Sequence, residues 1–231
     1  MDKLYTRTRG CLCFDLDGTI LNSVQESLKR VIKVAESCSL PIESNIEEKI
    51  ISGWKKSLGK QDFMFSIWPQ EAPDKLQVFM KAWEEMDSSE SYEIFPNTKE
   101  ALEKLCKYFY LGILTNRHLP SVFFQIRKNS LMPLFDFIVT PNWTKTKKPD
   151  PKMMIPVFEK CKQAGISEQN IILIGDTLEG DWQLAKNCGL EFYAVLAGGI
   201  HTREEFLVAG IPENHIIGSV ANLPDKLLIS G

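Results

Sequence analysis

The chain has 231 residues, enough for one large domain or a core with a smaller insertion. Hydrophobic residues make up 44% of it and charged residues 25%, which is an ordinary composition for a globular protein. With 27 Lys and Arg against 30 Asp and Glu and no basic run, nothing indicates a nucleic-acid partner, and the oligomeric state stays open. No apolar segment is long enough for a signal peptide or a membrane span, so we expect a protein of the cytoplasm with no membrane partner. The six cysteines lack the spacing of a zinc site, and we expect no disulfides.

Short apolar runs predict the strands of a sheet. They cover residues 11–16, 108–115, 135–140, 170–176 and 192–197. Continuous rather than alternating apolar runs are typical of parallel strands that are covered on both faces. The segments between them read as amphipathic helices, at 96–109, 150–165 and 180–189. This alternation predicts an α/β fold with a doubly wound parallel sheet.

The interval from residue 22 to 92 interrupts the alternation. It contains no convincing strand, whereas 23–37 and 73–86 have the spacing of amphipathic helices. Strand and helix alternate again from about Phe95. We therefore predict a core of residues 1–21 and 93–231 and an inserted helical domain of residues 22–92, joined to the core by two hinge segments.

Two aspartates, Asp15 and Asp17, come directly after the first apolar run. Clustered carboxylates repel one another and are costly to bury unless a cation lies near them. Ligands of a doubly wound sheet bind beyond the carboxyl ends of its strands, where other polar residues also gather. These residues are Thr115, Asn116, Arg117, Lys147, Lys148, Asp176, Glu179 and Asp181. Three or more carboxylates at one edge form a hard-cation site, which Mg²⁺ suits best.

The same residues fall into four ordered motifs. These are DLDGT at 15–19, LTN at 114–116, KPDP at 148–151 and GDTLEGD at 175–181. In content and order they resemble the motifs of the haloacid dehalogenase superfamily of phosphohydrolases, over residues 10–22 and 93–230. The helical insertion resembles the cap of its phosphoglycolate phosphatase-like subclass. The C-terminal segment also looks like the ending of that family, with a helix and a last short strand.

The resemblance implies a role for each core residue. Asp15 would be the nucleophile that becomes an aspartyl-phosphate, and Asp17 would be the general acid and then the base. Thr115 and Lys148 would bind the phosphoryl oxygens, and Lys148 would also keep Asp15 charged. The implied magnesium ligands are Asp15, the backbone carbonyl of Asp17, Asp176 and Asp181.

Two details bear on this resemblance. Asp176 and Asp181 are five residues apart, whereas many family members space them by four, so Glu179 is an alternative metal ligand. The presence of Asp17 argues against carbon–halogen cleavage, because family members with that activity lack an acid there.

Four residues are candidates for binding the rest of the substrate. Asn116 and Arg117 follow directly on Thr115. In the insertion, SGWKKSLG at 52–59 resembles a loop that lies over the active site of related enzymes. Gly53 would form its turn and Lys56 would reach the substrate. The alternative for this stretch is a solvated lysine pair beside a core tryptophan.

We therefore expect a Mg²⁺-dependent phosphatase of a small metabolite, such as phosphoglycolate, a nucleotide or a sugar phosphate. A phosphomutase of the β-phosphoglucomutase kind would share every catalytic residue, although TNR at 115–117 favours a hydrolase. A phosphonate-cleaving enzyme would need Lys55 or Lys56 as a Schiff-base lysine. A catalytically silent binding protein is disfavoured, since without a cation the acid cluster would only cost stability.

Overall fold

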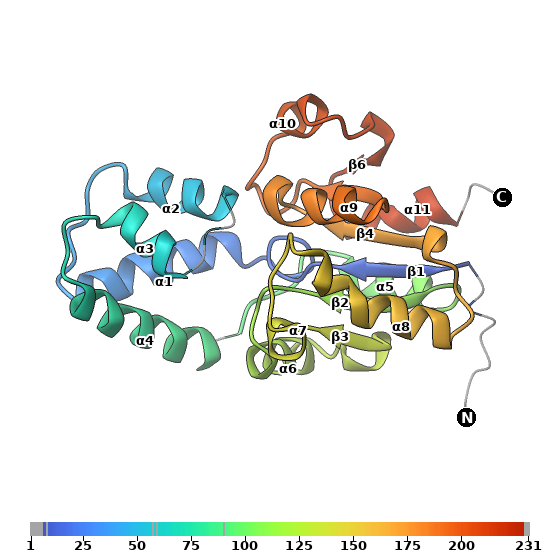
Figure 1. Cartoon of the computed structure of the whole chain (residues 1–231), viewed down its shortest axis with the longest axis horizontal. Helices are drawn as coiled ribbons and strands as arrows, with labels where there is room; N and C mark the ends of the chain where they lie inside the picture. Colours follow the sequence, from blue (N-terminus) through green and yellow to red (C-terminus); the bar gives the residue numbers. More distant parts are fainter. Residues whose placement is uncertain (1–6, 8, 57, 59, 90, 229–231) are drawn as a thin grey trace.

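The structure is a computed structural model that describes residues 7, 9–56, 58, 60–89 and 91–228. Its larger part is built on a parallel sheet of six strands in the order β3-β2-β1-β4-β5-β6 (Figure 1). The strands are β1 Cys11–Phe14, β2 Tyr110–Leu114, β3 Phe137–Val139, β4 Ile171–Gly175, β5 Glu191–Val195 and β6 Ile216–Ile217. The predicted doubly wound parallel sheet is confirmed, and each of the five apolar runs overlaps one strand.

Side-chain alternation along β1 explains why its sequence is apolar throughout. Leu12 and Phe14 point to one face of the sheet, and Cys11 and Cys13 point to the other. A separate hydrophobic cluster covers each face, so no position of the strand meets water. Because β2 and β4 lie on opposite sides of β1, the strand order reverses at the β1–β4 boundary.

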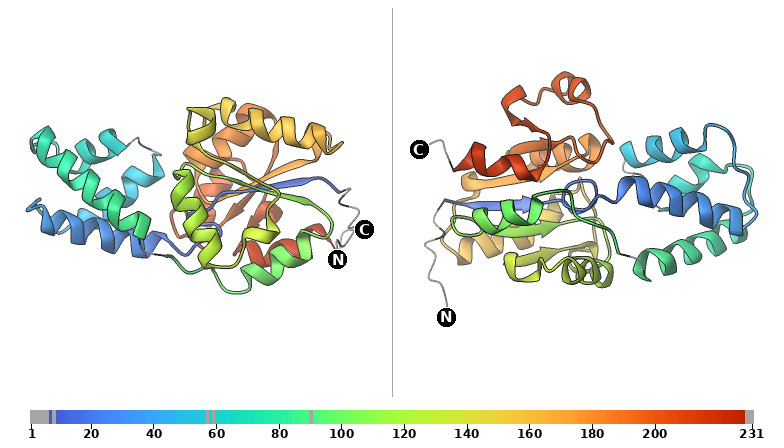
Figure 2. Two further views of the ribbon diagram at one scale, coloured as in Figure 1. Left: turned by 90° about the horizontal axis from the view of Figure 1, so that it is seen from below. Right: turned by 180° about the vertical axis from the view of Figure 1, so that it is seen from behind.

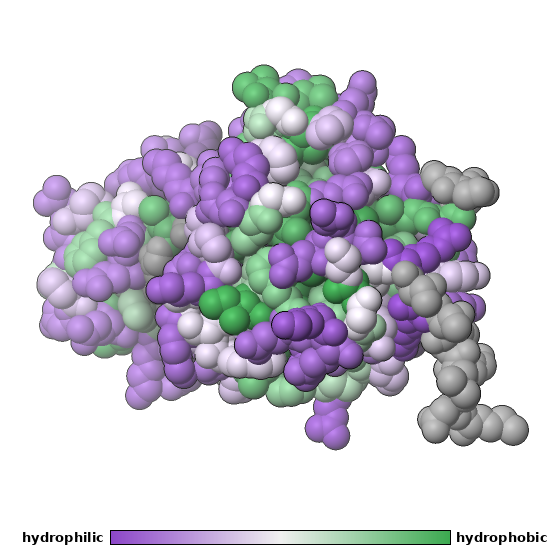
Figure 3. Space-filling view, turned by 45° about the vertical axis from the view of Figure 1, so that its right-hand side comes forward, coloured by the Kyte–Doolittle hydropathy of each residue, from purple (hydrophilic) through white to green (hydrophobic). Residues whose placement is uncertain are grey.

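Helices complete both layers around the sheet (Figure 2). The face under Leu12 packs against α5 Thr98–Leu105, α6 Leu119–Lys128 and α11 Leu223–Leu227. The opposite face packs against α8 Ile155–Gln163, α9 Gln183–Cys188 and α10 Arg203–Val208. Hydrophobic residues gather at the top of the view in Figure 3, the end at which α10 lies. Leu207 and Val208 of that helix are 41% and 90% exposed.

The interval between β1 and α5 is helical, as predicted. It consists of α1 Val24–Ser37, α2 Ile46–Lys55, α3 Lys60–Ile67 and α4 Pro73–Ser89. These helices share a hydrophobic cluster of their own and lie beside the sheet rather than on its faces (Figure 1). The assignment of residues 22–92 as a separate domain stays a prediction. Across the described part of the chain, no helix combines the length and apolar character needed to cross a membrane.

The two connections to the helical part run side by side. Leu21 and Ile94 form an antiparallel bridge, and the backbone N–H of Asn22 donates to the carbonyl of Glu93 at 2.8 Å. A further hydrogen bond runs from the Phe95 N–H to the Ile20 carbonyl at 3.1 Å. The helices are therefore attached to the sheet through one short paired stem.

Candidate active site

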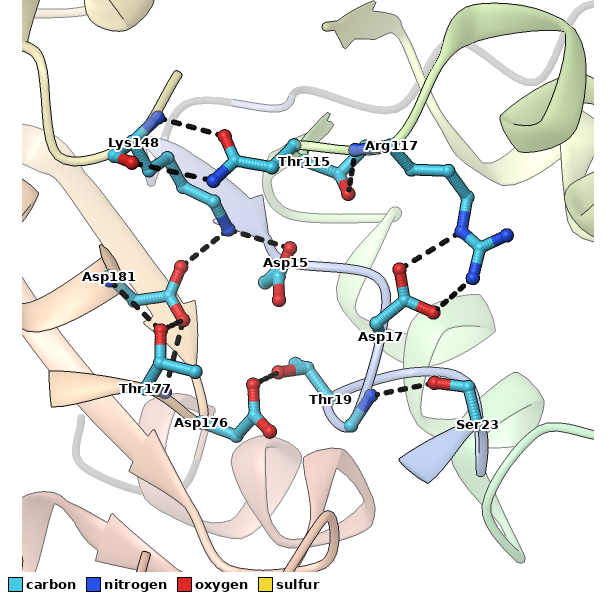
Figure 4. Close-up of polar contacts among 12 residues, drawn as sticks. Asp15, Asp17, Thr19, Ser23, Thr115, Arg117, Lys148, Asp176, Thr177 and Asp181 are labelled. Atoms are coloured by element: carbon cyan, nitrogen blue, oxygen red, sulfur yellow. Dashed lines mark hydrogen bonds and ion pairs between the residues drawn. The ribbon is translucent and has the colours of Figure 1, made fainter. Parts of the chain in front are cut away.

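Three polar residues that directly follow strands meet at the carboxyl edge of the sheet (Figure 4). Asp15 follows β1, Thr115 follows β2 and Asp176 follows β4. Backbone hydrogen bonds fix two of them. The Asp15 N–H donates to the Ile174 carbonyl at 2.8 Å, and the Thr115 N–H donates to the Val139 carbonyl at 3.2 Å. All three side chains are buried, at the point where the strand order reverses. The sheet itself brings these residues together, as the sequence predicted.

Lys148 places its ammonium group between two carboxylates. Its Nζ lies 2.6 Å from Oδ1 of Asp15 and 2.6 Å from Oδ1 of Asp181. The Lys148 side chain is only 5% exposed. Burial alone would lower the pKa of Lys148, but the two carboxylates outweigh it and raise the pKa above its ordinary value. Lys148 therefore stays charged and counterbalances part of the buried negative charge.

Asn116 fixes the backbone of Lys148. The Lys148 N–H donates to Oδ1 of Asn116 at 2.8 Å, and Nδ2 of Asn116 donates to the Lys148 carbonyl at 3.4 Å. The side-chain amide thus links the loop after β2 to the loop that carries the lysine. The structure shows Asn116 as a positioning residue, and its predicted contact with substrate stays a prediction.

A divalent cation fits three of the buried carboxylates. Among the described residues, Asp15, Asp176 and Asp181 each offer one oxygen within 4.8 Å of the others. Burial raises the pKa of Asp15 to about 7 although Lys148 opposes it, and burial also raises the pKa of Asp176 well above its ordinary value. Three close, buried carboxylates with one lysine leave negative charge uncompensated. This donor set is hard and oxygen-only, which suits Mg²⁺.

A π-helical turn, η4 Leu178–Trp182, accommodates the five-residue spacing of Asp176 and Asp181 in the last motif. The Trp182 N–H donates to the Thr177 carbonyl five residues back at 3.1 Å, so the turn holds one residue more than an α-helical turn. Thr177 closes the turn, since its hydroxyl donates to Oδ2 of Asp181 at 2.6 Å. Asp181 thereby reaches the cluster, whereas Glu179 lies half-exposed beside His201.

Asp17 turns away from the acid cluster and forms a two-point ion pair with Arg117. Nε of Arg117 donates to Oδ2 at 2.9 Å and Nη2 donates to Oδ1 at 2.6 Å. Nη1 also donates to Ser121 Oγ at 2.8 Å. Burial alone would raise the pKa of Asp17, but Arg117 outweighs it and holds the pKa below its ordinary value. The side chain of Asp17 is therefore not part of the carboxylate cluster, and the predicted metal contact of its backbone carbonyl stays a prediction.

Gly18 is required by close packing against Asp176. Its φ of +70° lies in the left-handed region, and a Cβ there would lie 2.1 Å from Oδ2 of Asp176. The Thr19 hydroxyl donates to the other carboxylate oxygen of Asp176 at 3.3 Å. The glycine and threonine of DLDGT therefore set the position of Asp176.

A cavity of about 860 Å³ lies above these residues, between the core and the helical part. Asp15, Asp17, Thr115, Lys148 and Asp176 line its core side. The helical part contacts the core at two places besides the stem. Lys55 of α2 forms an ion pair with Glu205 of α10 at 2.6 Å, and α4 contacts α6.

The predicted glycine turn over the site is wrong. Gly53 lies inside α2 and is buried, and a Cβ there would come within 2.6 Å of the Phe63 ring. Lys56 caps α2 and lines a separate small pocket rather than the main cavity. Trp54 and Leu58 line the main cavity in its place. A role of Gly53 or Lys56 in substrate binding stays an untested prediction.

The fold, with an acidic centre where its strand order reverses, is that of an α/β enzyme. A family model described as haloacid dehalogenase-like hydrolase matches residues 12–195. The chain therefore belongs to this hydrolase family, and the predicted family and enzyme class are confirmed.

The chain is similar in sequence to two curated relatives and in fold to one solved structure. It is 27% identical over 191 residues to a phosphoglycolate phosphatase of Nitrosospira multiformis, covering 80% of this chain and 82% of that protein. It is 25% identical to a phosphorylated carbohydrates phosphatase of Thermotoga maritima, covering 85% and 89%. YfnB of Bacillus subtilis, solved bound to magnesium, superposes with a TM-score of 0.65 at 20% identity, covering 88% of this chain and all of YfnB.

Proposed function

We propose that this protein is a Mg²⁺-dependent phosphatase that hydrolyses a small phosphate monoester through an aspartyl-phosphate at Asp15. The position of Lys148 carries the proposal, because its ammonium touches Asp15 beside a cavity and beside two further buried carboxylates. The named activities of the curated relatives support a phosphate ester as substrate. We further propose that residues 22–92 form a cap over the site.

In this mechanism an oxygen of Asp15 attacks phosphorus and the bond from phosphorus to the leaving oxygen breaks. The Thr115 hydroxyl and the Lys148 ammonium bind the oxygens of the transferring group. Mg²⁺ held by Asp15, Asp176 and Asp181 would neutralise part of the phosphoryl charge. Water then attacks the aspartyl-phosphate, which releases inorganic phosphate and restores the Asp15 carboxylate.

Asp17 handles the proton in both steps. It donates a proton to the leaving oxygen and later removes one from the attacking water. In the structure Arg117 holds Asp17 as a carboxylate, which is the form that accepts the proton of water. Proton donation in the first step therefore requires the ion pair with Arg117 to open.

The test is release of inorganic phosphate from sugar phosphates, nucleoside monophosphates and phosphoglycolate, with Mg²⁺ and with EDTA. We expect release that needs Mg²⁺ and is lost in Asp15→Asn. Asp225→Asn, an exposed aspartate of α11, is the matched control and should keep full activity. Release that is unaffected by EDTA or by Asp15→Asn would contradict the proposal. Absence of release with a trapped phosphoenzyme would favour the phosphomutase instead.

A further inference from the structure

The cavity is larger than a phosphoryl group with a two-carbon acid requires. Its volume of about 860 Å³ falls in the range of about 300–1,000 Å³ that buries drug-sized ligands. The residues proposed for phosphoryl transfer occupy only its core side. Residues of the helical part line the rest of the cavity together with further core residues, so they are positioned to contact the leaving group.

Two tryptophans form the helical side of this space. Trp54 of α2 and Trp83 of α4 both line the cavity, and both are half-buried. The buried ring of Phe63 lies between them. It stacks parallel to Trp54, with ring centroids 6.3 Å apart and planes at 1°, and its centroid is 5.7 Å from that of Trp83. The indoles are therefore held in place by packing while part of each faces the cavity.

The rest of the wall is mixed in character. Apolar residues line the cavity too, and they are Val24, Leu58, Pro120 and Ile200. Charged residues of α4 line it as well, and Lys81, Glu84 and Glu85 are exposed to solvent. The cavity that holds the phosphoryl site thus also offers apolar and aromatic surface, together with charged side chains of α4.

Contacts between the two parts fix the helices that carry the two indoles. The Lys55–Glu205 ion pair fixes the end of α2 immediately after Trp54, and α4, which carries Trp83, contacts α6. A ligand with its phosphate at Asp15 and Lys148 therefore shares one cavity with both indoles. Flat rings stack on such surfaces irrespective of their hydrogen-bonding edges.

We propose that the substrate is a phosphate monoester whose leaving group carries a flat aromatic or heteroaromatic ring, which stacks on Trp54 and Trp83. A nucleoside monophosphate has this chemistry. The inference rests on the proposed phosphatase function and specifies its substrate class. Stacking of one base is worth about 1–3 kcal/mol in alanine substitutions, which corresponds to about 5- to 150-fold in affinity.

The test compares uridine 5′-monophosphate with ribose 5-phosphate, which share the phosphate and the sugar and differ in the ring. We expect kcat/KM to be at least about tenfold higher for the nucleotide. Trp54→Leu and Trp83→Leu keep an apolar side chain but remove the stacking surface, so each should lower this ratio severalfold by reducing turnover of the nucleotide more than that of ribose 5-phosphate. Trp143→Leu is the control, because Trp143 is half-exposed and does not line the cavity.

Equal turnover of the two compounds, a preference for phosphoglycolate, or an equal loss on both substrates in the variants would overturn the inference. Failure of the phosphatase proposal is distinguishable, since no compound would then release phosphate. Measuring ligand binding would still test whether the ring stacks on the tryptophans in that case. In Asp15→Asn with Mg²⁺, tryptophan fluorescence should report a dissociation constant at least about tenfold lower for the nucleotide than for ribose 5-phosphate, and equal constants would refute stacking.

Discussion

Replacing Lys148 by methionine tests the electrostatics of the site most sharply. The substitution keeps much of the side-chain volume but removes the charge between Asp15 and Asp181. Removing one partner of a buried ion pair costs about 3–5 kcal/mol, because the other partner stays buried without compensation. The Lys148 side chain is 5% exposed and both of its ion pairs measure 2.6 Å, so the pair is buried and we expect a cost within this range of about 3–5 kcal/mol.

The metal should reverse much of this loss. A divalent cation at Asp15, Asp176 and Asp181 supplies the positive charge that the variant lacks. We expect the free energy of unfolding of Lys148→Met to be about 3–5 kcal/mol below wild type in EDTA, and the deficit to shrink by half or more at saturating Mg²⁺. Activity should remain at least about 100-fold reduced, because the phosphoryl oxygens lose a charged partner.

Urea unfolding at pH 8, followed by circular dichroism with EDTA and with Mg²⁺, measures these differences. Lys152→Met is the matched control, because Lys152 is exposed, and it should change stability by less than about 0.5 kcal/mol. Adding Asp181→Asn to Lys148→Met should recover part of the loss in EDTA by removing one uncompensated carboxylate. A Lys148→Met variant as stable as wild type in EDTA, or one whose deficit Mg²⁺ leaves unchanged, would refute this reasoning.

Three further predictions concern Asp15, Gly18 and Lys55. Without metal, burial raises the pKa of Asp15 from 3.8 to about 7, so the stability it contributes is present below pH 3.8 and is lost as pH rises through 7. The free energy of unfolding in EDTA should therefore fall by about 2–3 kcal/mol from pH 5 to pH 8, and a rise over this range would contradict the assignment. Gly18→Ala should weaken Mg²⁺ binding, measured by calorimetry, at least about tenfold, since its Cβ would displace Asp176. Gly189→Ala is the control and should leave Mg²⁺ binding unchanged, because Gly189 has a similar φ but its Cβ would meet open space. Lys55→Met should raise KM about two- to fivefold, because it removes the ion pair that holds α2 against α10, while the free energy of unfolding changes by less than about 1 kcal/mol. An unchanged KM would show that this ion pair has no part in holding the helical part over the cavity.

Local sequence patterns were sufficient to predict five of the six strands and the acidic edge of the sheet, whereas a last short strand was expected only from the family resemblance. Each apolar run of strand length marks a strand buried on both faces, and a residue that directly follows such a run must lie at the carboxyl edge. Asp15, Thr115 and Asp176 could be placed together for this reason, before any contact was known. The chain order of the motifs then related Lys148 to the same edge.

Contacts between distant segments could not be read from these patterns. Arg117 and Asp17 are 100 residues apart, and Lys55 and Glu205 are 150 apart, so neither pair has a local signal. Gly53 misled because glycine usually marks a turn, whereas here it makes room for the Phe63 ring inside a helix. The five-residue spacing of Asp176 and Asp181 was visible, but the π-helical turn that accommodates it was not.

The central claim is that Asp15 becomes phosphorylated during turnover. Acid quenching of the enzyme with Mg²⁺ and a radiolabelled phosphate ester, followed by peptide mapping, tests it directly. We predict label that is stable in acid and labile in base, on the peptide that contains Asp15, and no label in Asp15→Asn. Mg²⁺-dependent phosphate release that proceeds without label on that peptide, or that persists in Asp15→Asn, would contradict the claim.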